Sequence, residues 1–150
     1  MLTVRKRISM VLIDDNPSMR EGLVASMRAS RRFQVRTAPA QTTAVLRRVR
    51  KTKPDLVLLT LGPENDNSLS LAHALHTKIS AIRVVVIGLE PLHEDVMSFV
   101  RAGVSGFIMA RASFGTFLRT LRSVAQGTQV LPPELTHSLF AQLYGRGARN

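Results

Sequence analysis

Cysteine and tryptophan are absent from this chain, and tyrosine occurs once. Without cysteine the chain can form no disulfide and offers no thiolate for a metal site or for nucleophilic catalysis. An absence of cysteine suits a reducing compartment, so a cytoplasmic location is expected. Because exposed aromatic rings are the usual platform for nucleic-acid bases, the scarcity of such rings argues against a direct nucleic-acid binder.

Long apolar runs are also missing, since none approaches the roughly 18 residues that a membrane-spanning helix needs. The basic start of the chain resembles a signal peptide only superficially, because its apolar part, Met10–Ile13, ends at two aspartates. The sequence contains no glycine-rich phosphate loop, nucleophile elbow or zinc motif. Neither a membrane protein nor an enzyme is therefore expected.

Acidic residues are scarce, with 10 Asp and Glu against 21 Lys and Arg, which gives a net charge of +11. Residues 1–53 carry 13 of the cations and three of the acids. Such a bias permits a non-specific nucleic-acid-binding module built on the Arg-rich first third. No base-reading motif accompanies the charge, so a solvated basic surface remains the simpler interpretation.

Short apolar runs alternate along the chain with patterns of helical spacing. The runs predict strands at Ile8–Ile13, Phe33–Thr37, Pro54–Thr60, Arg83–Gly88 and Gly106–Met109, each followed by a helix. Strands joined by single helices form parallel units with right-handed crossovers. The sequence therefore predicts an α/β three-layer sandwich with the third strand at its centre.

The last two helices of this pattern and the C-terminal segment have recognisable ends. Pro91–Ala102 is predicted as a helix with Val96, Phe99 and Val100 facing inward, and Ser113 as the cap of a helix that runs through Ala125. Residues 1–127 are expected to form the domain, and residues 128–150 a linker and a short amphipathic helix, Pro133–Leu143. The apolar side of that short helix consists of Leu135, Leu139, Phe140 and Leu143.

Ordered motifs over residues 8–140 resemble a known family. The segments VLIDDNPSMREGLVASM, PDLVLLTLGP, VVVIG, AGVSGFIMARAS and VLPPELTHSLF resemble the CheY-like receiver domain of bacterial two-component response regulators. The branch they resemble is the NarL type, whose receivers precede a LuxR-type helix-turn-helix. The resemblance implies a flavodoxin-like fold with strand order 2-1-3-4-5, five helices and the short C-terminal helix.

In that family one aspartate is phosphorylated, and the resemblance assigns its site to five positions. An acidic pair, matched by Asp14 and Asp15, holds Mg²⁺ together with the acceptor aspartate. Thr60 stands where the acceptor is expected. Gly88 stands in place of the family's Ser or Thr, and Ala110 in place of its Lys.

Each of these three replacements removes the group that acts in the family. A Thr hydroxyl without a base is a weak nucleophile at neutral pH, so Thr60 is not expected to form an acyl phosphate. Asp14 and Asp15 alone are expected to hold Mg²⁺ weakly at most, so no cofactor is expected beyond that ion. Gly88 has no hydroxyl and Ala110 no cation to contact a phosphoryl group.

The resulting hypothesis is a degenerate receiver that signals without aspartyl phosphorylation. Its expected partner is another protein or a second copy of the chain, through the last helix and its neighbours. DNA would be reached through an output domain that these 150 residues do not contain, or weakly through the basic surface.

Two other possibilities have less in their favour. An enzyme using the two aspartates and Thr60 would need a base and a substrate pocket, and the sequence indicates neither. His73 and His76 share a helix face at a spacing that can hold a metal, but no third ligand is evident. Two exposed histidines are therefore expected.

Overall fold

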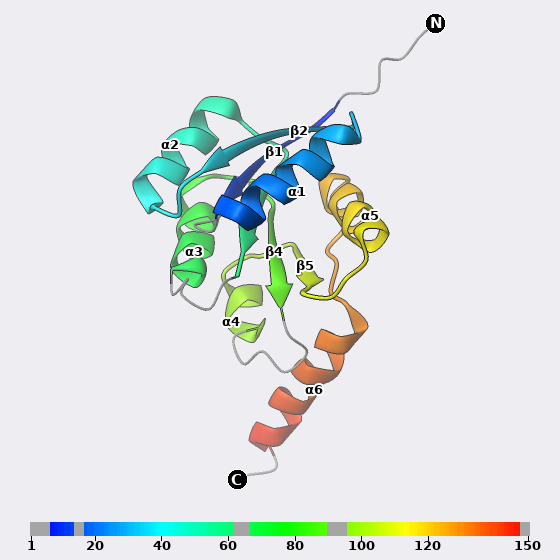
Figure 1. The fold of residues 1–150 in the computed structure, drawn as a ribbon. Coiled ribbons are helices and arrows are strands. Elements are labelled where there is room, and N and C mark those ends of the chain that lie inside the picture. Colours follow the sequence, from blue (N-terminus) through cyan, green and yellow to red (C-terminus); the bar gives the residue numbers. More distant parts are fainter. Residues whose placement is uncertain (1–6, 14–16, 62–66, 90–95, 148–150) are drawn as a thin grey trace, which may run out of the picture.

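The computed structural model describes residues 7–13, 17–61, 67–89 and 96–147. Five parallel strands form one sheet in the order β2-β1-β3-β4-β5 (Figure 1), which confirms the predicted fold and strand order. The strands are β1 (Ile8–Ile13), β2 (Phe33–Ala38), β3 (Leu56–Thr60), β4 (Val84–Leu89) and β5 (Gly106–Met109). The helices are α1 (Pro17–Ala29), α2 (Thr42–Thr52), α3 (Ser68–Lys78), α4 (Val96–Arg101), α5 (Phe114–Ala125) and α6 (Pro133–Gly147).

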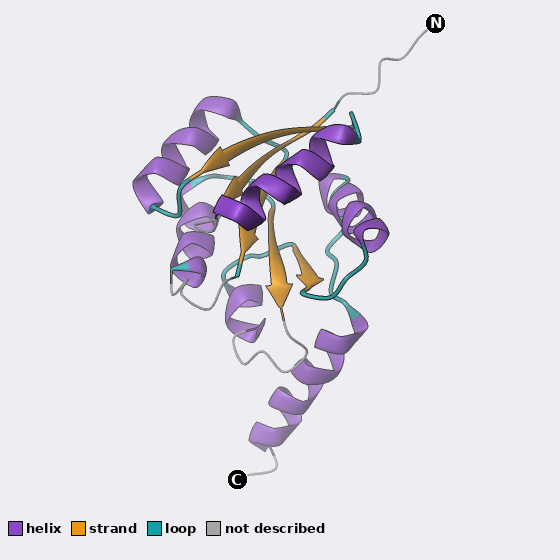
Figure 2. Ribbon diagram, viewed as in Figure 1, coloured by secondary structure: helices purple, strands orange, loops and turns teal. Residues whose placement is uncertain are grey.

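Helices cover both faces of the sheet (Figure 2), and the alternation of side chains along β3 explains the two cores. Leu56 and Leu58 pack with residues of α1 and α5 on one face. Val57 and Leu59 pack with residues of α2, α3 and α4 on the other. All four side chains are completely buried, as expected for the central strand of a parallel sheet.

Most element ends agree with the sequence, and the differences have local causes. The hydroxyl of Ser113 accepts a hydrogen bond from the backbone N–H of Thr116 at 3.1 Å, so the predicted cap of α5 is confirmed. β3 begins at Leu56, later than the expected Pro54, because proline has no N–H to donate to a strand pair. The expected start of the fourth helix, residues 91–95, lies outside the described residues.

The prediction that Val100 faces inward is wrong, because this side chain is 41% exposed. Val100 lies in the last turn of the short helix α4, where the chain turns toward β5. Ala102 and Val104 take the buried positions at this point, while Val96 and Phe99 face the core as predicted.

The segment after α5 adds to the sheet instead of leaving it. The N–H of Val130 donates to the carbonyl of Ser105 at 3.0 Å, and the N–H of Phe107 donates to the carbonyl of Val130 at 3.1 Å. Leu135, in the first turn of α6, is completely buried in the core on the α2, α3 and α4 face.

Farther along, α6 leaves the domain and ends well away from the sheet (Figure 1). Leu139 is partly buried against the same core, whereas Phe140 is 57% exposed. The side chain of Leu143 is outside the described part. The domain boundary at residue 127 stays a prediction. Val130 and Leu135, which follow this boundary, both contact the domain.

Candidate functional site

The carboxyl ends of parallel strands meet at one edge of a sheet, and this edge is where open α/β folds place their ligands. Thr60 is the last residue of β3 and pairs in register with Ile87 of β4. Gly88 follows Ile87, and Ala110 follows the last residue of β5. The topology thus brings three of the five expected positions to this edge. Asp14 and Asp15 come after β1 in the sequence and lie outside the described residues.

Thr60 is buried and engaged in a hydrogen bond. Its side chain is 2% exposed, and its hydroxyl Oγ1 donates to the carbonyl oxygen of Ile13 at 3.1 Å. This bond ties the end of β3 to the end of β1. A hydroxyl that is closed off from solvent and already donates its proton to a carbonyl is poorly placed to attack an incoming phosphoryl group.

Gly88 has a backbone that suits glycine. Its φ is +96°, in the region that L residues with a side chain rarely adopt, and the register of β4 against β5 shifts beside it. A Cβ at this position would lie 3.2 Å from the carbonyl oxygen of Leu61. The bulge was not predicted from the sequence, although a glycine inside an apolar strand is a typical signal for one.

Ala110 and Arg111 are exposed in the turn after β5 and border a hollow of about 490 Å³. Thr116 and Thr120 of α5 line the same hollow, and so do residues 130–134. This hollow was not predicted from the sequence, because one side of it is formed by the segment around Val130, which pairs with the edge of the sheet.

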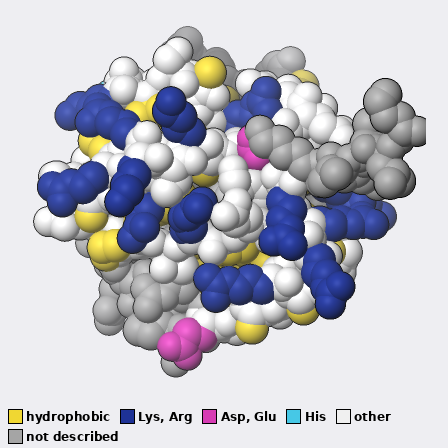
Figure 3. Space-filling view, turned by 90° about the horizontal axis from the view of Figure 1, so that it is seen from above, with side chains coloured by type: hydrophobic (Ala, Val, Ile, Leu, Met, Phe, Trp, Pro, Cys, Tyr) yellow, Lys and Arg dark blue, Asp and Glu magenta, His cyan; other side chains and the backbone are white. Residues whose placement is uncertain are grey.

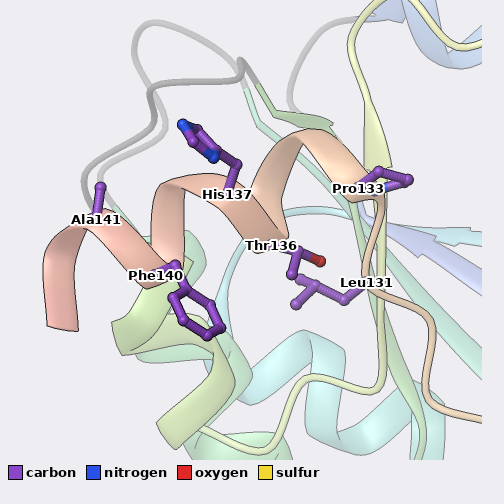
Figure 4. A pocket seen from close by; sticks show the side chains of 6 residues that line it. All are labelled: Leu131, Pro133, Thr136, His137, Phe140 and Ala141. Carbon is purple, nitrogen blue, oxygen red and sulfur yellow. The ribbon is translucent and has the colours of Figure 1, made fainter. Parts of the chain in front are cut away.

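A second hollow runs along α6 (Figure 4). Leu131, Thr136 and Phe140 project to one side of the helix in this view, and His137 and Ala141 to the other. It is an apolar surface on an element that extends from the domain. A cluster of catalytic groups is not found there among the side chains that the structure describes.

Metal ligands do not gather elsewhere in the described ranges. Groups of three or more His, Cys, Asp or Glu side chains in metal-binding proximity are absent from that part of the chain. His73 and His76 are exposed on α3, and His76 packs beside Gly103, where an added Cβ would lie 2.2 Å from Nδ1 of the ring. None of the described helices is long and apolar enough to cross a membrane.

Curated relatives and solved structures agree with this architecture. The chain is 21% identical over 141 residues to the nitrate/nitrite response regulator protein homolog of Haemophilus influenzae, covering 94% of this chain and 68% of the relative. It is 27% identical over 135 residues to the nitrate/nitrite response regulator protein NarL of Escherichia coli, covering 90% of this chain and 62% of the relative. The chain therefore spans about two thirds of the length of these relatives.

A crystal structure of a LuxR-family two-component response regulator from Aurantimonas superposes with a TM-score of 0.78 at 18% identity. The match covers 93% of this chain and 99% of the solved one, and at this identity it shows the fold alone. The family model for the response regulator receiver domain matches residues 10–122, which is most of the chain. The chain therefore belongs to the response regulator receiver domain family, whose members act in two-component signalling and not as enzymes.

Proposed function

We propose that this chain is a receiver that is not switched by aspartyl phosphorylation and acts through contacts with a protein partner or with a second copy of itself. The proposal takes Thr60 as the residue at the acceptor position, which is what the resemblance to the family implies. The observation that carries the proposal is the state of that residue: its hydroxyl is buried and donates to the Ile13 carbonyl at 3.1 Å. An acyl phosphate needs a carboxylate, and Thr60 supplies none.

The backbone at Gly88 gives independent support. In the family, the hydroxyl of a Ser or Thr after the fourth strand contacts the phosphoryl group. At Gly88, the positive φ and the nearby Leu61 carbonyl disfavour any side chain, so a hydroxyl cannot be restored without strain. A phosphoryl group here would lack contacts that differ between two conformations, and without such contacts it would shift no equilibrium.

Magnesium has a diminished role in this proposal. Asp14 and Asp15 would be the remaining carboxylates for the ion, and the third carboxylate of the family's set is replaced by a hydroxyl that faces a carbonyl. Mg²⁺ prefers a nearly complete octahedral shell of oxygen ligands. We expect the chain to bind it weakly at most.

Control of transcription is the expected context. The relatives are response regulators longer than this chain, and the resemblance is to receivers that precede a LuxR-type helix-turn-helix. In this context α6 would lead toward an output domain. Val100 of α4 and Phe140 of α6 are apolar side chains that are 41% and 57% exposed, and α4 contacts α6, which supports a protein interface at these two helices.

Intact mass spectrometry tests the proposal directly. The chain is incubated with acetyl phosphate and Mg²⁺, alongside a receiver known to accept phosphate as the positive control. We expect no added phosphoryl mass on this chain. Addition of one phosphoryl group, mapped to Asp14, Asp15 or Thr60, would show that the site is active and would overturn the proposal.

A further inference from the structure

The opposite edge of the sheet, where the strands begin and the helices end, carries a dense set of cations. Figure 3 shows this end of the molecule, which is the upper end in Figure 1. Lys and Arg side chains are spread over it, and few acidic side chains are visible. The basic edge, as we name it, consists of residues before strands and in the last turns of helices: Arg7, Arg28, Arg31, Arg32, Arg50, Lys51, Lys53, Arg83 and Arg122.

Backbone hydrogen bonds show that the cations at the strand entries form a row. The N–H of Ile8 donates to the carbonyl of Arg32, which places the entry of β1 beside that of β2. The N–H of Val57 donates to the carbonyl of Arg83, which joins the entries of β3 and β4. The guanidinium of Arg83 donates in turn to the carbonyl of Ala125, at the end of α5. With strands about 4.8 Å apart, the four entries span roughly 14 Å.

The charge of the basic edge is largely uncompensated within the described part of the chain. Arg28 and Arg83 donate to backbone carbonyls, of Val35 and Ala125. The side chains of the other seven cations make no hydrogen bond or ion pair with another described residue. Asp55 is an acidic residue at this edge. Its carboxylate accepts hydrogen bonds from the backbone N–H and the hydroxyl of Ser9.

The needs of the fold explain only part of this charge. Cations in the last turn offset the negative end of a helix dipole, which accounts for Arg28, Arg50 and Arg122. Arg31 and Lys53 are different, because their φ values of 57° and 47° are left-handed and favour glycine. Both positions therefore carry a cation where the backbone alone would favour a residue without a side chain.

The surroundings of the basic edge indicate what kind of anion fits. The exposed large apolar side chains of the described residues are Val100, Phe114 and Phe140, and none belongs to this edge. A membrane surface usually gains an inserted apolar face, and a protein interface usually has an apolar centre. The chain also has 17 Arg among its 21 cations, and the guanidinium is the group best matched to phosphate.

From these observations we propose that the basic edge binds the phosphate backbone of double-stranded nucleic acid, independently of its sequence. A duplex fits better than a single strand, because the edge has no exposed aromatic ring on which unpaired bases could stack. The contacts involve Arg83 and Arg122 as well as the Arg-rich first third. The surface lies at the end of the sheet opposite Thr60, so this proposal does not depend on whether the chain can be phosphorylated.

The first measurement uses the 150-residue chain and a fluorescent DNA duplex of about 20 base pairs, followed by anisotropy at several salt concentrations. Binding through phosphates is expected to be micromolar or weaker near physiological salt and to weaken steeply as salt rises. Unlabelled duplexes of unrelated sequence are expected to compete equally. No binding at low salt, or binding without a salt dependence, would overturn the proposal.

The variant Arg31→Gly/Lys53→Gly tests the location. Because both residues have left-handed backbones, glycine removes two charges and is expected to leave the melting temperature unchanged or higher. The slope of log affinity against log salt is expected to fall by about two. Should this variant unfold, Arg32→Gln/Lys51→Gln removes two exposed cations of the same edge and carries the same expectation.

Single-charge variants separate location from net charge. Arg31→Gly and Arg111→Ala each remove one exposed Arg, but Arg111 follows β5 at the other end of the sheet. The first is expected to weaken duplex binding clearly more than the second. Equal effects would overturn the proposed surface. Vesicles containing phosphatidylserine serve as the competing partner, and binding to these without binding to the duplex would also overturn it.

Discussion

The backbone N–H of Phe107 donates to the carbonyl of Val130 at 3.1 Å, and this bond ties the segment after α5 to the outer edge of β5. A free strand edge is open to pairing with other chains, and a short bridged segment is one way to cover it. Val130 and its neighbours then lead directly to Leu135, which is completely buried. The segment that leaves α5 is therefore part of the packed domain over this stretch.

Leu135→Ala is expected to destabilise the domain by about 2–5 kcal/mol, because it leaves a cavity in the core. Phe140→Ala is the matched control on the same helix, and with a side chain that is 57% exposed it is expected to change stability by less than about 1 kcal/mol. Urea unfolding followed by circular dichroism measures both. Equal effects would mean that the first turn of α6 is not packed as described.

Removing residues 128–150 is expected to lower the melting temperature. This truncation deletes the hydrogen bonds of Val130 and the burial of Leu135 together. Removing residues 141–150 leaves both in place and is the control. An unchanged melting temperature for the chain that ends at residue 127 would support a domain boundary there.

We expect the chain to self-associate through the apolar side chains of α4 and α6. Phe140→Glu is expected to shift the chain toward monomer, since it places a charge on the exposed apolar surface, while Phe140→Leu should not. Light scattering over a range of concentrations distinguishes these cases. If the unaltered chain is a monomer at every concentration, the prediction of self-association is wrong, and a different protein would be the expected partner for this surface.

Gly88 and Gly22 are expected to respond to alanine in opposite directions. Gly88→Ala should destabilise the domain by about 1 kcal/mol or more, because its φ is +96° and the new Cβ would press on the Leu61 carbonyl. Gly22 lies within α1 with nothing within 4 Å of an added Cβ, so Gly22→Ala should stabilise it by about 0.5–1 kcal/mol. Thermal unfolding of the two variants tests both expectations. If Gly88→Ala leaves the stability unchanged, the argument that this position cannot hold a side chain with a hydroxyl is lost.

Thr60→Val is expected to destabilise the domain by about 1–3 kcal/mol, because it keeps the shape but leaves the Ile13 carbonyl without this donor. Thr60→Ser retains the hydroxyl and should cost less. Chemical unfolding of the two variants compares the loss of the hydroxyl with the loss of the methyl group. A fully stable Thr60→Val would mean that the bond contributes little.

Thr60→Asp places a carboxylate against the Ile13 carbonyl, so it is expected to destabilise the domain in the presence of a chelator. Mg²⁺ should recover part of the loss, because Asp14 and Asp15 would then converge with a third carboxylate. Phosphorylation should remain poor, since Gly88 and Ala110 are unchanged. A Mg²⁺ titration of the melting temperature, with the unaltered chain as control, tests this expectation, and no response to Mg²⁺ would contradict it.

The sequence by itself determined the order and type of the elements. Runs such as Leu56–Leu59 are short and apolar without alternation and are flanked by Pro and Gly, which favours a strand covered on both faces. The start of α5 was predicted correctly from Ser113, because a helix cap depends only on a hydrogen bond between residues three positions apart in the sequence. The alternation of strands with single helices then required a parallel sheet, and the resemblance to the family supplied the strand order.

The tertiary structure decided what depends on contacts between distant segments. The sequence could name Thr60 but not show that its hydroxyl points to Ile13, a residue on another strand. It could not show that Val130 pairs with β5, or that Val100 faces outward while Ala102 is buried. The basic edge is of the same kind: Arg32, Arg83 and Arg122 are far apart in the chain, and only a parallel sheet, which gathers strand starts and helix ends at one edge, brings them together.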